Sequence, residues 1–137
     1  MPTPSLMAQG DVRPSRFVKI DPDNDRGALE SDANERVIGI SMEGSREAPI
    51  PSVTTALAAQ DGEQMHFYGQ GEICLLELGG TVSSNDRLKS DADGKGVVIA
   101  TTGTTIQHFG AVALRDGVSG DKIEVQVLIG SERPALA

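Results

Sequence analysis

An alternation of apolar and polar side chains near the end of the chain constrains the fold more than any other feature. In residues 122–129 the apolar side chains of Ile123, Val125, Val127 and Ile129 alternate with Lys122, Glu124, Gln126 and Leu128. Successive side chains of a strand point to opposite faces, so this period of two predicts a strand with one buried face. The strand is the best-specified element of the sequence.

Short apolar runs between turn signals predict further strands along the chain. They lie at residues 16–20, 36–42, 64–68, 72–78 and 105–114. Residues 86–90 and 96–101 are predicted to pair through a two-residue type I′ turn at Asp93-Gly94, because both central positions of that turn need positive φ. Since no segment shows sustained helical periodicity, we expect an all-β fold.

The two halves of the sequence repeat the same order of features. In the first half a strand near Phe17 leads to an acidic turn, an apolar strand that starts at Val37, and a strand that ends at Phe67. The second half has a strand at Leu88, an acidic turn, an apolar strand at residues 108–114 and the alternating strand. We predict two copies of one β unit, facing each other as halves of a sandwich or a closed barrel.

Two segments fall outside this pattern. Residues 1–15 contain three prolines and no periodicity, which predicts an extended N-terminal arm that is ordered only on contact with a partner. Residues 16–137 would then form one small β-sandwich or barrel domain. Residues 45–59 are predicted to form a long irregular loop. Loops of that length in small β domains usually have a function or contact a partner.

Composition limits the classes of function. A chain of 137 residues is the size of one domain, but its hydrophobic content is 38% with three Phe, one Tyr and no Trp. The core should be thin, and burial against other chains could complete it. The net charge of −8 argues against nucleic acid as a partner. No apolar run approaches the ~20 residues that span a bilayer, so we expect no membrane partner and synthesis in the cytosol.

Residue types that could carry chemistry are few and scattered. The single Cys74 lies in an apolar run, which favours a small buried thiol. His66 and His108 lack the neighbouring ligands of a metal site. Asp21, Asp23 and Asp25 have the spacing of a calcium loop, but the glycine comes one position late and the twelfth residue is Asp32, so an acidic turn is favoured. We expect no catalytic residue, no cofactor and no metal.

Two stretches of the second half carry a recurring pattern. Residues 72–96 read Glu-Ile-Cys-Leu-Leu-Glu-Leu-Gly-Gly-Thr-Val and then Asp-Arg-Leu-Lys-Ser-Asp-Ala-Asp-Gly-Lys-Gly, and residues 109–125 contain Phe-Gly-Ala-Val-Ala-Leu and Gly-Asp-Lys-Ile-Glu-Val. The pattern resembles the capsid decoration, or cement, proteins of tailed bacteriophages, which are small β-sandwiches or barrels on the outside of the head. Asn85 stands where glycine is commoner in that family, and asparagine also accepts positive φ.

The resemblance implies a virion structural protein. It would be made in the host cytoplasm, bind the major capsid protein on the outer capsid surface and stabilise the shell lattice, without enzymatic activity. It would associate with itself, as a trimer in preference to a dimer. The candidate capsid or subunit contacts are Leu6, Met7 and Val12 in the arm and Pro49, Ile50 and Val53 in the loop.

Two other functions stay open at this point. The chain could be a head fibre or receptor-binding knob that recognises a host surface glycan through residues 45–59. It could also be an enzyme of trimeric β fold, such as a nucleotide hydrolase, although no motif for one is found. Binding to expanded empty capsids would separate the first reading from both alternatives.

Overall fold

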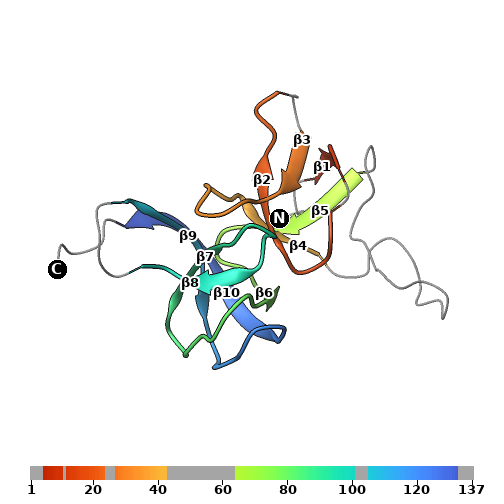
Figure 1. Ribbon diagram of the computed structural model, residues 1–137. Helices are drawn as coiled ribbons and strands as arrows, with labels where there is room; N and C mark the ends of the chain where they lie inside the picture. The colour runs from red at the N-terminus through yellow and green to blue at the C-terminus, as the bar shows by residue number, and fades with distance from the viewer. Residues whose placement is uncertain (1–4, 11, 24–26, 43–63, 101–104, 133–137) are drawn as a thin grey trace.

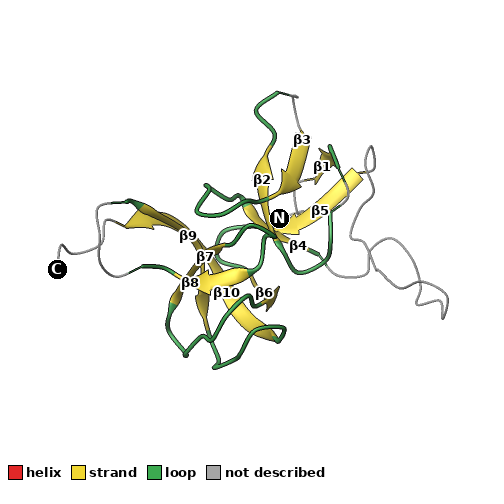
Figure 2. Ribbon diagram, viewed as in Figure 1, coloured by secondary structure: helices red, strands yellow, loops and turns green. Residues whose placement is uncertain are grey.

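The computed structural model describes residues 5–10, 12–23, 27–42, 64–100 and 105–132. These residues form two five-stranded sheets, and the predicted all-β class is confirmed (Figures 1 and 2). Among them no helix is long and apolar enough to span a bilayer. The strands are β1 (Ser5–Ala8), β2 (Phe17–Ile20), β3 (Gly27–Glu30), β4 (Gly39–Ser41), β5 (Gln64–Tyr68), β6 (Ile73–Glu77), β7 (Arg87–Ser90), β8 (Gly96–Val98), β9 (Gln107–Ala113) and β10 (Lys122–Glu132).

The first unit, β1–β5, is a closed barrel in the order β1-β3-β2-β4-β5. Strand β1 closes it, because it pairs in parallel with β3 and antiparallel with β5. A cluster of buried apolar side chains fills its interior, formed by Ala8, Val12, Val18, Ala28 and Phe67. Four of these five side chains are small. Their size fits the narrow interior of a five-stranded barrel.

The second unit, β6–β10, is a sheet in the order β6-β10-β9-β7-β8. Its longest strand is the alternating segment found in the sequence, with Ile123, Val125 and Val127 buried and the residues between them exposed. Just beyond β6, Leu78 forms a parallel bridge with Gly96 of β8. That bridge brings the two edges of the sheet together, so this unit also curls toward a barrel.

The two units have the same strand connections, as the sequence repeat predicts. The first strand is antiparallel to the fifth and parallel to the third in both units, with the Leu78–Gly96 bridge in the place of the β1–β3 pair. The acidic turns share one hydrogen bond: the Oδ1 atoms of Asp21 and Asp91 accept the N–H groups of Asp23 and Asp93, at 2.9 and 2.8 Å. The units are therefore structural duplicates.

The arrangement of the duplicates differs from the prediction. We expected each copy to supply one half of a single sandwich or barrel. Instead each copy curls on itself, because its first strand reaches both the third and the fifth strand of its own unit, and the two copies lie side by side (Figure 1). The larger apolar cluster joins them: it contains the interior of the second unit together with Phe17, Val37 and Ile40 of the first.

The expectation for residues 1–15 needs correction. Residues 5–8 are strand β1, which pairs with β3 and β5 of the same chain, and Val12 is fully buried in the barrel. Backbone hydrogen bonds to two strands and an apolar side chain in the core order this segment without a partner. The described part of residues 1–15 thus belongs to the first unit and is not a separate arm.

The hairpin between β7 and β8 is confirmed, but its predicted turn is wrong. Ser90 pairs with Gly96, which leaves residues 91–95 as the loop, and within it positive φ occurs at Gly94. The Oδ1 atom of Asp91 accepts N–H groups from both Asp93 and Lys95, at 2.8 and 2.9 Å. These two hydrogen bonds from the backbone to the Asp91 side chain stabilise a five-residue loop in place of the two-residue turn.

The close approach of the two units depends on Gly110 of β9. A Cβ atom there would overlap the side chain of Val37 and lie 2.8 Å from Cε1 of Phe17. We expect Gly110→Ala to lower the free energy of unfolding by about 1–3 kcal/mol, because two packed side chains must move. Gly69→Ala is the control, since its Cβ would meet no atom closer than 3.8 Å. Equal urea midpoints for the two variants would contradict this packing.

Candidate functional site

A polar seam joins the units beside their shared apolar cluster. The guanidinium of Arg16 pairs with Glu77 of β6 at 3.2 Å and donates to the carbonyl oxygen of Asp93 at 3.0 Å. The N–H of Phe17 donates to the carbonyl oxygen of Gly94 at 2.7 Å. The Arg16 side chain is 7% exposed and that of Glu77 20%. Because these groups are largely buried, we interpret the seam as a structural contact that holds the two units together.

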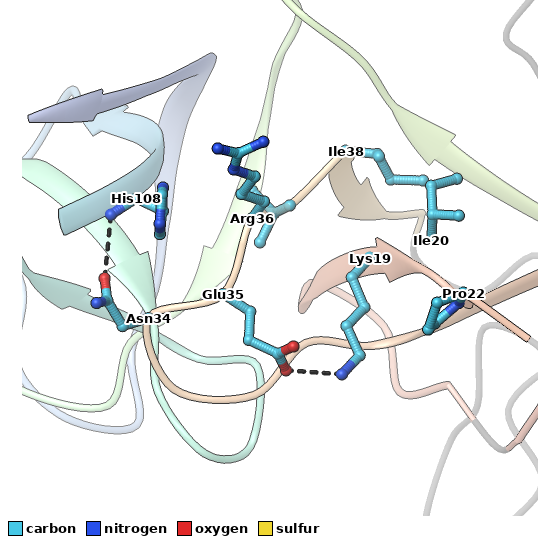
Figure 3. Close-up of a pocket in the computed structure, with 9 residues that line it drawn as sticks. Lys19, Ile20, Pro22, Asn34, Glu35, Arg36, Ile38 and His108 are labelled. Atoms are coloured by element: carbon cyan, nitrogen blue, oxygen red, sulfur yellow. Dashed lines mark hydrogen bonds and ion pairs between the residues drawn. The ribbon is translucent and has the colours of Figure 1, made fainter. Parts of the chain in front are cut away.

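A hollow of about 460 Å³ opens beside residues 34–38, which run from the start of β9 back to β2 of the first unit (Figure 3). Asn34 anchors the crossing: its Oδ1 accepts the N–H of His108 and its Nδ2 donates to the carbonyl oxygen of Ile106, both at 3.0 Å. Asn34 has a φ of 56°, which asparagine tolerates better than most residues. The apolar part of the lining includes Ile20, Pro22 and Ile38.

The charges at this hollow are mixed. Lys19 Nζ donates to Glu35 Oε1 at 2.6 Å and to Asp32 Oδ2 at 3.2 Å. The bond to Glu35 raises the pKa of Lys19; partial burial opposes this rise and the bond to Asp32 adds to it. The lysine is therefore charged at neutral pH. Arg36 adds an exposed positive charge beside them.

The histidine in this lining has no metal-ligand partners nearby. His108 Nδ1 lies 2.7 Å from Ser131 Oγ, and across the described ranges no group of three His, Cys, Asp or Glu side chains could hold a metal ion. Apolar side chains with separate charges of both signs suit a contact with another protein surface. This hollow could not be predicted from the sequence, because residues 19–22, residues 34–38 and His108 come together only in the folded chain.

The structure separates the residues that the sequence singles out as contacts. Met7 on β1 is 50% exposed, whereas the Val12 side chain is fully buried inside its own barrel. Leu6 pairs with Met65 through the backbone. Pro49, Ile50 and Val53 lie outside the described residues. Of the described candidates, Met7 presents an apolar side chain that another molecule can reach.

The outer face of the second sheet is an apolar surface that the sequence analysis missed. One cross-strand row on it runs through Ile73, Gln126, Val112 and Arg87. Ile73 is 60% exposed, and Leu75 and Leu128 on the same face are 37% and 40% exposed. Beside the row a hollow of about 590 Å³ is lined in part by Val98, Val112 and Leu128. From the sequence we assigned the apolar run of residues 73–76 to the core. The exposure of Ile73 and Leu75 was therefore not predicted.

Comparison with known proteins places the fold. The chain is similar to the crystal structure of the head fibre gp8.5 N base in bacteriophage phi29, with a TM-score of 0.59. The likeness covers 92% of each chain, at 14% sequence identity. At this identity the likeness establishes a shared fold. No protein-family model and no curated protein sequence matches the chain.

Proposed function

We propose that this chain is a structural protein of a bacteriophage virion, bound to the outer surface of the capsid. One observation carries the proposal: nearly the whole chain has the fold of a phage head fibre base. The motif resemblance to capsid decoration proteins supports the same class on different grounds, since it rests on residues 72–96 and 109–125. The major capsid protein and further copies of this chain are the proposed partners.

Surface properties of the chain fit that role. Eight large apolar side chains are exposed among the described residues, including Met7, Ile20 and Ile73. Burying such surface against a shell and against other copies is favourable, and many weak contacts on a lattice add up through avidity. A net charge of −8 suits a protein that faces solvent and does not contact packaged nucleic acid.

A head fibre or receptor-binding role is the second candidate. The similar structure is described as a head fibre base, which favours this candidate over an enzyme. With this second role the chain would still belong to the virion, and residues 45–59 would recognise a host surface glycan. Stabilisation of the shell and adhesion to a host predict different partners, so one set of binding assays separates them.

Co-sedimentation of the purified protein with expanded empty capsids tests the proposal. We expect saturable binding at a fixed ratio to the capsid protein. The double variant Ile50→Glu, Val53→Glu should bind about tenfold more weakly or worse, since full burial of each such side chain contributes about 1.5–3 kcal/mol. The double variant Thr81→Glu, Ser119→Glu, at two exposed polar positions, adds the same charge as a matched control and should bind like the parent.

The other outcomes point to the alternatives. Adsorption to host cells without capsid binding would support the receptor-binding role. Hydrolysis of an added nucleotide would support the enzyme alternative. Either result, with capsids left undecorated, would overturn the proposal of shell attachment.

A further inference from the structure

The hollow of Figure 3 lies at the junction of the two units, and both units line it. Lys19, Ile20 and Pro22 come from β2 and the turn that follows it. In Figure 3 they lie on one side and His108 of β9 on the other, with residues 34–38 running between them. Binding sites occur preferentially at such junctions, because side chains from separate elements converge there. Its volume of about 460 Å³ is large enough to admit a side chain of another molecule.

Hydrogen bonds fix the wall of the hollow that residues 34–38 form. The N–H of Asn34 donates to the carbonyl oxygen of Ser90 at 3.0 Å, and the Asn34 side chain makes two further bonds to the second unit. At the other end of the wall, the N–H of Ile38 donates to the carbonyl oxygen of Val18 at 2.9 Å. A partner that enters the hollow meets an ordered surface, so less conformational entropy is lost on binding.

The apolar part of the lining is accessible to a partner. Ile20, at the end of β2, is 48% exposed, and Ile38 is partly buried where it packs against the core of the first unit. Pro22 lines the same hollow two residues beyond Ile20. Removing this apolar surface from water is favourable, so the lining suits an apolar side chain of the partner.

The two cations of the lining differ in their partners. Lys19 pairs with Glu35 and Asp32, so carboxylates of its own chain already compensate its charge. Arg36 is exposed, and among the residues that the structure describes it forms no ion pair. A guanidinium presents its N–H groups in a planar fork that matches a carboxylate. Arg36 is therefore the group in this hollow that is available to an acidic partner.

We propose that the hollow binds an acidic segment of a partner polypeptide, in which a carboxylate lies next to an apolar side chain. The apolar side chain packs on Ile20, Pro22 and Ile38, which line the hollow together. The carboxylate accepts hydrogen bonds from the guanidinium of Arg36. Arginine is enriched among the residues that contribute most to protein interfaces, and apolar contacts around such a pair exclude water from it.

The major capsid protein is a better occupant of this hollow than a second copy of the chain. Each copy has a net charge of −8, so the charges of two copies repel each other as they approach. Assigning the segment to the capsid protein rests on the proposed function and deepens it, because it names a surface of attachment and the chemistry that this surface recognises. This contact is separate from residues 45–59.

Co-sedimentation of charge variants with expanded empty capsids tests the contact. Arg36→Glu should bind about tenfold more weakly than the parent, or worse, because it places a carboxylate opposite the carboxylate of the partner. Arg36→Lys should bind with intermediate affinity, since lysine keeps the charge and loses the fork. Arg115→Glu is the matched control: it makes the same change of charge at a side chain 69% exposed, outside the hollow, and should bind like the parent.

The apolar part of the contact has its own pair of variants. Ile20→Glu should also bind about tenfold more weakly, because it places a charge where an apolar side chain is buried. Thr81→Glu, at an exposed polar position, adds the same charge and should leave binding unchanged. Added salt should weaken the binding of the parent more steeply than that of Arg36→Gln, since this variant has one ion pair fewer. All variants should keep the circular dichroism spectrum of the parent.

The possible results separate this inference from the proposed function. Capsid binding by the parent and equally tight binding by Arg36→Glu would overturn the inference and leave capsid attachment intact. A parent that does not bind capsids would overturn both. If Arg36→Glu changed the sedimentation velocity of the free protein with capsid binding intact, a second copy would occupy the hollow. If it abolished adsorption to host cells alone, a host molecule would occupy it, and either result overturns the assignment to the capsid protein.

Discussion

The Val125→Asp variant should lose about 4 kcal/mol or more of its free energy of unfolding. Val125 is fully buried in the middle of β10, between Cys74 of β6 and Ala113 of β9, both buried themselves. A carboxylate there would meet the apolar side chains of the larger cluster and lose its hydration. Urea denaturation followed by circular dichroism measures the loss.

Gln126→Asp provides the matched control on the same strand. Its side chain points to the outer face and is exposed, so the added charge stays in water and the midpoint should move little. If the two aspartates destabilise the protein equally, the faces of β10 have been assigned wrongly. A Val125→Asp variant as stable as the parent would lead to the same conclusion.

Removing Glu77 should produce the second large loss, about 3 kcal/mol for Glu77→Ala. The side chain of Arg16 is 7% exposed, and Glu77 is its ion-pair partner across the seam. Arg16 Nε already has no hydrogen-bond partner in the described structure. Without Glu77 the buried guanidinium still donates to the carbonyl oxygen of Asp93, but its charge is no longer compensated by this carboxylate.

Glu124→Ala is the control for this pair. Glu124 also pairs with an arginine, Arg115, at 3.7 Å, but the two side chains are 55% and 69% exposed. An exposed pair contributes about 0–1 kcal/mol, so the midpoint should barely change. Comparable losses for Glu77→Ala and Glu124→Ala would show that the seam does not depend on its buried ion pair.

The sequence predicted best where a strand has a regular pattern or a turn has a fixed chemistry. The alternation around Val125 identified both the strand and its buried face, and residues 64–68 match β5 in full. Asn85 has the positive φ of 75° that was expected where the related pattern has glycine. The repeat was visible as well, because its acidic turns and strands occur in the same order in each half.

Short strands with remote partners could not be found in this way. Strand β3 has four residues and β1 lies in a proline-containing segment, and neither alternates clearly. Their pairing is parallel, which needs a long connection and leaves no hairpin signal between them. The closure of the barrel depends on this pairing together with that of β1 and β5.

The surfaces for contact were harder still to predict. Ile73 and Cys74 are neighbours in an apolar run, yet the first is 60% exposed and the second 8%. The pattern shows that one of the two faces the core, but an apolar run does not say which one faces outward.

Electron microscopy of phage particles that carry this protein would show directly whether it binds the outer surface of the capsid. We expect discrete density there, repeated at equivalent positions of the shell lattice, into which the two-unit fold fits. Particles made without the protein should lack that density and be otherwise complete. Protein-bearing particles with a bare outer surface, or with the protein inside the shell or confined to the tail, would show that the chain is not a protein of the outer capsid surface.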